Sequence, residues 1–99
     1  MAELNPIIHQ PTRLRIMAAL VSLEKDEKVD FVFLRDLLEL TDGNLSVHLY
    51  KLEEAKYVMV EKAFVERRPK TWIWATTGGR DAFAAHVDAL EAIVGQARL

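Results

Sequence analysis

Two short amphipathic segments joined by two residues constrain the fold of this chain most strongly. The first begins after Asp30, a residue suited to a helix N-cap, and its apolar face ends near Glu39. The second is capped by Thr41 and runs over about residues 42–55, with leucines at i, i+4 and i+7 that form a buried stripe: Leu45, Leu49 and Leu52. So tight a connection between two helices predicts a helix-turn-helix.

One more helix and a charged loop are expected ahead of this pair. Pro11 is a residue type favoured at the first helical position, and apolar residues then recur at helical spacing to about Leu23. The five charged residues from Glu24 to Lys28 predict a solvated loop. A minimal strand is expected at Val29.

The hydrophobic period changes at Tyr57, and this change predicts a β-hairpin. Residues 57–65 and 71–76 are rich in β-branched and aromatic side chains, which favour strands. Between them lie two arginines and Pro69. Because proline cannot continue a strand ladder, residues 66–70 are expected to form the hairpin tip.

The last helix is expected over residues 80–97, after Thr77-Gly78-Gly79 breaks the second strand. At 100° per residue its apolar arc spans about 220°, roughly twice what a surface helix buries against its own domain. Some of that arc is therefore expected to contact a second chain. The large side chains suit such a seam and a neighbouring stripe of alanines permits close approach, although the two roles can be exchanged. The candidate dimerisation residues, completed by apolar residues of the N-terminal leader, are Phe83, Val87, Leu90, Val94, Leu4, Ile7 and Ile8.

Composition narrows the function classes. Ninety-nine residues provide one core, so a single domain over residues 1–99 is expected. The lack of cysteine excludes disulfides, thiolate metal sites and cysteine nucleophiles, and the three histidines lie on separate elements without paired-ligand spacing. There is also no Gly-rich phosphate loop. We therefore expect no enzymatic activity, no metal and no cofactor.

The longest unbroken apolar run, Ile16 to Val21, has six residues, against the roughly 20 that a membrane helix needs. No membrane span and no signal peptide are expected. A cytoplasmic location is the expectation that follows, and the lack of cysteine is consistent with it.

The charge pattern is uneven along the chain. A net charge of -2 argues weakly against nucleic acid as a partner, yet residues 62–70 carry +3 and the remainder carries -5. Cations concentrated on a hairpin suit contact with phosphates, while a merely soluble hairpin tip explains them equally well. The cations in question are Lys62, Arg67, Arg68 and Lys70.

The helix over residues 42–55 provides a second, independent indication. Its face opposite the leucine stripe offers donors and acceptors suited to bases and phosphates, namely Asn44, Ser46, Tyr50 and Lys51. Val47 on the same face suits a thymine methyl group. His48 lies at the boundary of the buried face, where a packing role and a DNA contact are equally good interpretations.

Three segments together resemble a known family. They are residues 40–55 (LTDGNLSVHLYKLEEA), 67–71 (RRPKT) and 76–80 (TTGGR), within a match from about Pro11 to the last helix that covers four-fifths of the chain. The chain resembles the small single-domain winged-helix transcriptional regulators related to the MarR and ArsR groups. The resemblance implies an α+β, mainly helical winged helix-turn-helix, with a core over residues 11–79, a β-hairpin wing and a C-terminal dimerisation helix.

The resemblance also implies a homodimer bound to double-stranded DNA. The helix over residues 42–55 would enter the major groove, and the wing over residues 62–71 would lie on the backbone or in the minor groove. Carried over by position, the recognition-helix candidates are Thr41, Asn44, Ser46, His48 and Lys51, and the wing candidates are Arg67, Arg68 and Lys70.

Two departures from the family pattern stand out. Relatives usually have glycine where this chain has Lys56, at a position expected to be left-handed. Relatives are also less bulky at Trp72 and Trp74, which are expected on the strand face away from the core. There they either cover the hairpin and Phe64 or form a surface for a ligand or partner.

One alternative function comes from a different class of protein. A winged helix can serve as a protein-interaction module without specific DNA binding, and the overall acidity of the chain keeps that interpretation open. A small-molecule effector of unknown identity also stays open as a partner. Thiol redox sensing and thiolate-metal sensing are not expected without cysteine.

Overall fold

Residues 3–97, the part of the chain that this computed structural model describes, form four helices and three strands. Their order is α1 (Pro11–Val21), β1 (Val29–Asp30), α2 (Phe31–Leu37), α3 (Asp42–Glu54), β2 (Val58–Val65), β3 (Arg68–Ala75) and α4 (Thr77–Ala97). The strands pair antiparallel in the order β1-β3-β2. The expected α+β, mainly helical architecture with a hairpin wing is therefore confirmed, including the minimal strand at Val29.

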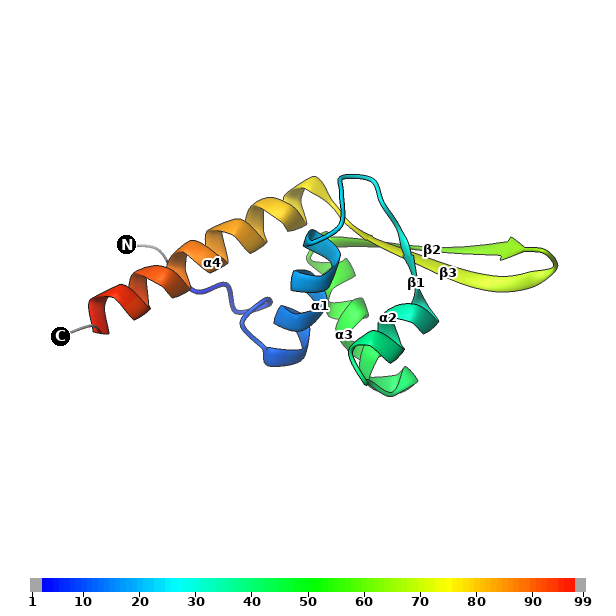
Figure 1. Cartoon of the computed structure of the whole chain (residues 1–99), viewed down its shortest axis with the longest axis horizontal. Coiled ribbons are helices and arrows are strands. Elements are labelled where there is room, and N and C mark those ends of the chain that lie inside the picture. The colour runs from blue at the N-terminus through cyan, green and yellow to red at the C-terminus, as the bar shows by residue number, and fades with distance from the viewer. Residues whose placement is uncertain (1–2, 98–99) are drawn as a thin grey trace.

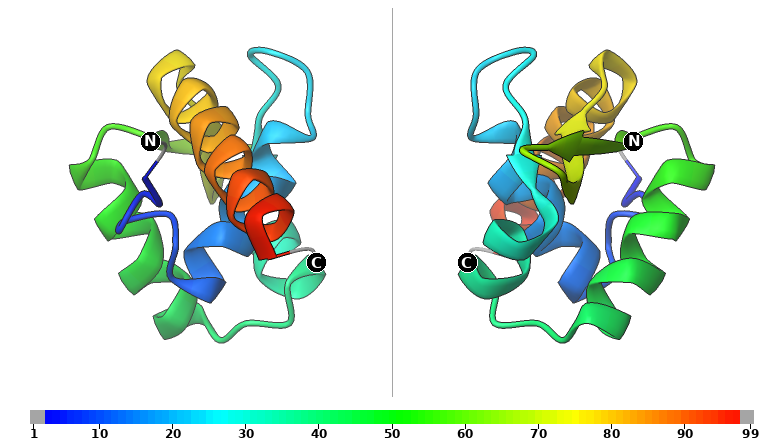
Figure 2. Two further views of the ribbon diagram at one scale, coloured as in Figure 1. Left: turned by 90° about the vertical axis from the view of Figure 1, so that its left-hand side faces the viewer. Right: turned by 90° about the vertical axis from the view of Figure 1, so that its right-hand side faces the viewer.

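The molecule is elongated, because the β2–β3 hairpin and α4 extend from opposite sides of the body formed by α1, α2 and α3 (Figure 1). Its principal extents are 58 × 25 × 21 Å. The radius of gyration of 14.7 Å exceeds the roughly 13 Å of a compact domain of this length. Helix α1 is central, since it packs against α3, β3 and α4 (Figure 2).

The core is apolar and joins all the helices to the sheet. The leucine stripe of α3 points inward as expected, and Ile73 reaches the core from β3. The largest fully buried apolar side chains are Ile8, Ile16, Met17, Leu20, Leu34, Leu45, Leu52, Ile73 and Val58.

Side-chain caps begin three of the helices where the sequence predicts them. The Thr41 hydroxyl accepts the N–H of Asn44 at 3.1 Å, and an Asp30 carboxylate oxygen accepts the N–H of Phe33 at 3.0 Å. Gln10 caps α1 with Pro11 in the first position. Helices α1 and α2 each end two residues earlier than expected.

Left-handed residues end α2 and α3. Glu39 has φ 54°, and the N–H of Leu40 donates to the carbonyl of Arg35 at 3.0 Å, so the turn of the helix-turn-helix is longer than two residues. Lys56 has φ 65°, as expected, and the N–H of Tyr57 donates to the carbonyl of Leu52 at 2.9 Å. The C-terminal ends of α2 and α3 therefore both have the hydrogen bond of a Schellman motif, although neither has glycine at the left-handed position.

The hairpin tip is shorter than the sequence predicts. Glu66 and Arg67 have φ 52° and 66° and form a two-residue turn, so β3 begins at Arg68 and contains Pro69. Alternate residues of an antiparallel strand point their N–H away from the partner. Because β1 pairs only with residues 72–73, the other side of β3 is open at Pro69, and the ladder loses no hydrogen bond there.

The two tryptophans lie on the face of the hairpin away from the core, as expected. Trp72 is opposite Glu61, Trp74 is opposite Met59, and lysine ammonium groups lie 5.2 and 4.5 Å from the two ring centroids respectively. Phe64 belongs to the other face of the hairpin. The expectation that the tryptophans cover Phe64 is therefore wrong.

Helix α4 begins at Thr77, three residues earlier than expected. The Thr76 hydroxyl accepts the N–H of Gly79 at 2.9 Å and donates to the carbonyl of Lys56 at 2.7 Å. The N–H of Thr76 donates to the carbonyl of Tyr57 at 3.0 Å. A Cβ atom on Gly79 would overlap that carbonyl, so Gly79 is there for close packing and does not break the helix.

The N-terminal leader docks on this junction through Asn5. Its N–H donates to Nδ1 of His86 and its side-chain amide donates to the Tyr57 hydroxyl, both at 2.9 Å. Burial lowers the pKa of His86, and His9 beside it lowers that pKa further. Ile8 is fully buried in its own core, so this candidate is unavailable for a contact with a second chain.

We expect Gly79→Ala to lower the free energy of unfolding by at least about 2 kcal/mol, because the new methyl group must displace the Tyr57 backbone. The matched control is Gly78→Ala, whose Cβ would lie at an ordinary 3.8 Å from the Thr76 hydroxyl oxygen. That change should be neutral or stabilising by up to about 1 kcal/mol. Urea titration measures both, and equal effects would contradict the packing role of Gly79.

Lys56→Gly should raise the free energy of unfolding by up to about 1 kcal/mol, because glycine adopts φ 65° without steric cost. The control is Ala55→Gly, at φ -77°, where glycine brings no such relief and should destabilise the protein. Thermal and urea unfolding of the two variants in parallel check the sign. A less stable Lys56→Gly protein would contradict the strain.

Candidate nucleic-acid interface

The face of α3 opposite its leucines is open to solvent. Val47 is 61% exposed and Tyr50 is 59% exposed, and they lie near the middle of that face. Asn44, Ser46 and Lys51 are exposed as well. A helix with an apolar inner stripe and this outer face can enter a groove without losing its own packing.

The exposed residues divide between two flanks of α3. At 100° per residue, Asn44 and Lys51 fall on one side of Val47 and Ser46 falls on the other. Ser46 and Tyr50 line a cleft of about 380 Å³ between α3 and the hairpin, with Lys62 of β2 on the opposite wall. This cleft presents hydroxyl and ammonium groups that suit a phosphate contact, and Glu53 at the same cleft offsets part of the positive charge.

His48 faces α1 instead of the open side. Its Nδ1 lies 3.3 Å from a guanidinium nitrogen of Arg13, and that guanidinium also donates to the carbonyl of Ile7. Burial lowers the pKa of His48, and the charge of Arg13 lowers it further. Of its two interpretations, the structure therefore favours packing, with neutral His48 holding α3 against α1.

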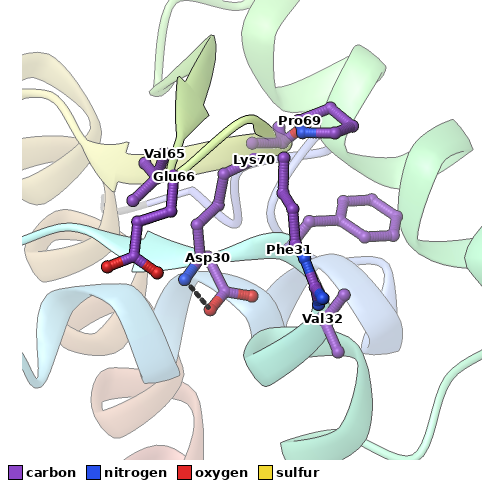
Figure 3. A pocket seen from close by; sticks show the side chains of 9 residues that line it. Asp30, Phe31, Val32, Val65, Glu66, Pro69 and Lys70 are labelled. Carbon is purple, nitrogen blue, oxygen red and sulfur yellow. Dashed lines mark ion pairs between the residues drawn. The ribbon is translucent and has the colours of Figure 1, made fainter.

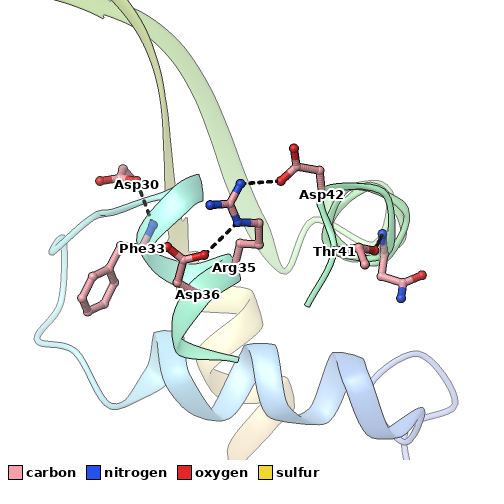
Figure 4. Close-up of polar contacts among 7 residues, drawn as sticks. Asp30, Phe33, Arg35, Asp36, Thr41 and Asp42 are labelled. Carbon is pink, nitrogen blue, oxygen red and sulfur yellow. Dashed lines mark hydrogen bonds and ion pairs between the residues drawn. The ribbon is translucent and has the colours of Figure 1, made fainter. Parts of the chain in front are cut away.

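Arg35 links the two helices of the helix-turn-helix. Its guanidinium donates to Asp36 at 2.9 Å and to Asp42 in the first turn of α3 at 2.7 Å (Figure 4). Hydrogen bonds to the carboxylates of Asp36 and Asp42 raise the pKa of Arg35 above its ordinary value. Because Asp42 would repel a phosphate at the N-terminus of α3, this ion pair reduces a charge conflict there.

The cations of the hairpin are divided between its faces. Lys62 lies on the face toward α3, Arg67 lies in the turn, and Arg68 and Lys70 lie on the opposite face. The Lys70 ammonium is 3.8 Å from a carboxylate oxygen of Asp30 beside a pocket at the base of α2 (Figure 3). Lys70 is thus half-buried and paired with an acidic residue of its own chain, while Arg67 and Arg68 are exposed.

A family model described as "Winged helix DNA-binding domain" matches residues 12–94. The chain belongs to this winged-helix family. The match covers the helix-turn-helix, the wing and most of α4, so the chain is a DNA-binding domain of the kind its fold indicates. A closer relation to the MarR and ArsR groups stays a prediction.

Winged-helix relatives are found in archaea. An uncharacterized protein of Methanocaldococcus jannaschii is 42% identical over 81 residues, which cover 82% of this chain and 85% of that protein. The structure of a transcriptional regulator homologue from Pyrococcus horikoshii OT3 superposes with a TM-score of 0.84 and 30% sequence identity. The match covers 94% of this chain and 89% of that protein's chain. A protein of Methanosarcina mazei Go1, described as a possible transcriptional regulator, shares the fold at 16% identity and a TM-score of 0.63, over 91% of this chain and 77% of its own.

Three side chains of the winged helix near α3 or the wing were not predicted as part of the interface. Arg13 and Arg35 make contacts between helices, which no local sequence pattern reports. Phe64 is 80% exposed beside the wing tip, although it was expected to be covered by the tryptophans. Counting along the strand from the core residues Val58 and Val60 would have placed Phe64 on their face, beyond the end of the core.

Two kinds of site are not found in the described part of the winged helix. Within residues 3–97, no group of three or more His, Cys, Asp or Glu side chains is placed to hold a metal ion. Within the same residues, no helix combines the length and the apolar character that crossing a membrane requires.

Replacing Arg67 and Arg68 together by Ala should weaken binding to all duplex sequences similarly, because both side chains are exposed and suit phosphates. The slope of log affinity against log salt should fall by about 2 per subunit, near 0.9 for each lost contact. The control is Lys25→Ala, which removes an exposed cation from the loop after α1. A loss confined to one preferred sequence would mean that the arginines read bases.

Proposed function

We propose that this winged-helix protein is a transcriptional regulator that binds double-stranded DNA with sequence specificity as a homodimer. The observation that carries the proposal is the open face of α3 beside a wing that holds exposed cations. Helix α3 enters the major groove, and the wing lies on the backbone or in the minor groove. The name of the Pyrococcus horikoshii relative, a transcriptional regulator homologue, supports the same role.

Base reading falls to the exposed face of α3. Asn44, Ser46 and Lys51 supply the hydrogen-bonding groups, and Val47 meets a thymine methyl group. Thr41, Tyr50 and the cations of the wing contact the DNA backbone. The contact of His48 with Arg13 makes it a residue that positions α3.

The homodimer follows from the face of α4 that its own domain leaves open. Gly79, His86 and Ala89 are buried against the domain, whereas Ile93 and Val94 are 46% and 54% exposed. Val87, Leu90, Glu91, Val94 and Gly95 line a groove on the open side. Ala85 and Ala92 of the alanine stripe are exposed as well, so it is this groove that favours the large-residue stripe as the proposed seam.

We propose a smaller set of seam residues than the sequence predicts. Phe83 and Ile7 pack partly against their own core, and Ile8 is fully buried in it. The remaining candidates are Leu4, Val87, Leu90 and Val94.

A protein-interaction module is the second candidate, favoured by the net charge of -2 and by the acidic residues of α4. A selection from random 40-bp duplexes, followed by salt titration, separates the two functions. A specific regulator enriches one sequence and loses affinity steeply with salt. A protein-interaction module enriches nothing and scarcely binds DNA.

We expect Asn44→Ala to cost about 1–3 kcal/mol of binding free energy on the selected duplex and little on unrelated duplexes, because it removes a base contact. Ser46→Ala and Lys51→Ala should behave in the same way. Lys25→Ala again serves as control for the loss of one exposed charge. Unchanged sequence preference in all three variants would contradict base reading by α3.

Val94→Glu and Leu90→Glu should give folded monomers with strongly reduced affinity for the selected duplex, since each places an unpaired charge in the seam. Val94 is more than half exposed, so its variant should stay folded and melt lower only by the stability that dimer formation adds to the wild type. The control is Asp88→Asn, an exposed position of α4 outside the groove. Sedimentation measures the mass, and a wild-type monomer at micromolar concentration would contradict the homodimer.

A further inference from the structure

Phe64 presents an aromatic ring to solvent at the far end of the wing. It is 80% exposed, more than Val47 or Tyr50 on α3, and it lies opposite Pro69 in the last pairs before the turn. A phenylalanine in this position forgoes the burial that normally stabilises the residue. Its hydrophobic surface is therefore available to a partner.

The side of the hairpin that carries Phe64 is the side that faces α3. Successive cross-strand pairs on this side are Val58–Ala75, Val60–Ile73, Lys62–Thr71 and Phe64–Pro69. The first two pairs contribute to the core, and Lys62 and Thr71 line the cleft against α3. Phe64 and Pro69 thus continue the same wall outward, about 7 Å beyond the cleft at the rise of a β-strand.

Charge indicates the kind of partner. Exposed cations lie on both sides of Phe64 along the chain, at Lys62, Arg67 and Arg68. Glu66 in the turn is exposed too, but the cations outnumber it. An apolar ring in such a positively charged setting matches a groove in which stacked bases lie between two rows of phosphates. Minor-groove proteins insert Phe or Pro side chains between base steps and kink the duplex in such a setting.

We propose that Phe64, backed by Pro69, is a wedge that enters a base step in the minor groove next to the major groove occupied by α3, and bends the DNA. This inference rests on the proposed DNA-binding function. The two-residue turn and the strand pairing up to Val65–Arg68 hold the backbone of Phe64 in place before binding, which limits the entropy lost on insertion.

The test uses 40-bp duplexes with a donor and an acceptor dye at the two ends and 2-aminopurine at TA steps. The sequence is the one that wild-type protein enriches from the random pool, or the unselected pool if none is enriched. Wild-type protein should raise energy transfer, with a bend of about 20–90°, and should raise 2-aminopurine emission through unstacking. Phe64→Ala should abolish both signals and weaken binding only about three- to tenfold, since the unstacking cost disappears with the contact.

Two variants complete the design. Phe64→Leu should keep most of the bend, because leucine is also a wedge residue. Val65→Ala truncates the neighbouring apolar side chain on the opposite face of the hairpin and should bend DNA like the wild type. All variants should melt like the wild type, because neither residue belongs to the core.

The possible outcomes test the wedge separately from the proposed DNA-binding function on which it rests. A straight complex that keeps its sequence preference would leave the DNA-binding function standing and overturn the wedge. A Phe64→Ala complex bent like the wild type would overturn it too. A wild-type protein that binds no duplex would contradict the proposed function and the wedge together.

Discussion

The carbonyl groups of Lys56 and Tyr57 fix the relative positions of the helices and the hairpin. Both accept hydrogen bonds from Thr76, one from its hydroxyl and one from its N–H. Because Lys56 and Tyr57 connect α3 to β2, while Thr76 connects β3 to α4, two hydrogen bonds hold four elements at one point. Gly79 allows this approach, since any side chain there would occupy the place of the Tyr57 carbonyl. These contacts, together with the packing of β2 on α3 in the core, set the angle between α3 and the wing, which decides whether both can contact one duplex.

The same junction connects the candidate DNA surface to the candidate dimer surface. Asn5 binds both the Tyr57 hydroxyl and His86 of α4, so the leader spans from the start of the hairpin to the last helix. Arg80, one turn into α4, donates to the carbonyls of Val21 and Leu23 and so satisfies the C-terminal end of α1. Helix α4 is held firmly at its first half, and its second half extends as an exposed apolar arm.

Local patterns predicted the elements whose signals are local. Helix α3 follows from its leucine stripe and the Thr41 cap, and its outward residues follow from the same period. The hairpin tip did not follow, because the rule against proline in a strand ignores which way the missing N–H would point; at Pro69 it points to an open edge. The start of α4 did not follow either, because the need for Gly79 lies at Tyr57, far away in the sequence.

The candidate site shows the same division. Exposure along α3 could be predicted, whereas the contacts of His48 with Arg13 and of Asp42 with Arg35 depend on how helices cross, for which no residue spacing gives a signal. Ile8 has no periodic neighbours that would assign it to the core or to an interface. The left-handed Lys56 was expected only because a family resemblance named the position, since lysine itself carries no such preference.

The net charge of -2 is compatible with DNA binding because the charges are separated along the long axis of the molecule. The wing carries +3 over residues 62–70, whereas α4 carries three carboxylates, Asp81, Asp88 and Glu91, and one arginine that is occupied with α1. Figure 1 shows these two elements extending in opposite directions. Under the proposed function, a duplex therefore attracts the wing and repels α4, which favours approach with the wing toward the phosphates. Helix α3 itself carries a net charge of -2, from Lys51 against Asp42, Glu53 and Glu54, so its place in the complex is set by the fold and not by its charge. The overall acidity limits non-specific adhesion without weakening the local attraction, because at physiological salt a charge acts over only about 8 Å while the molecule is 58 Å long.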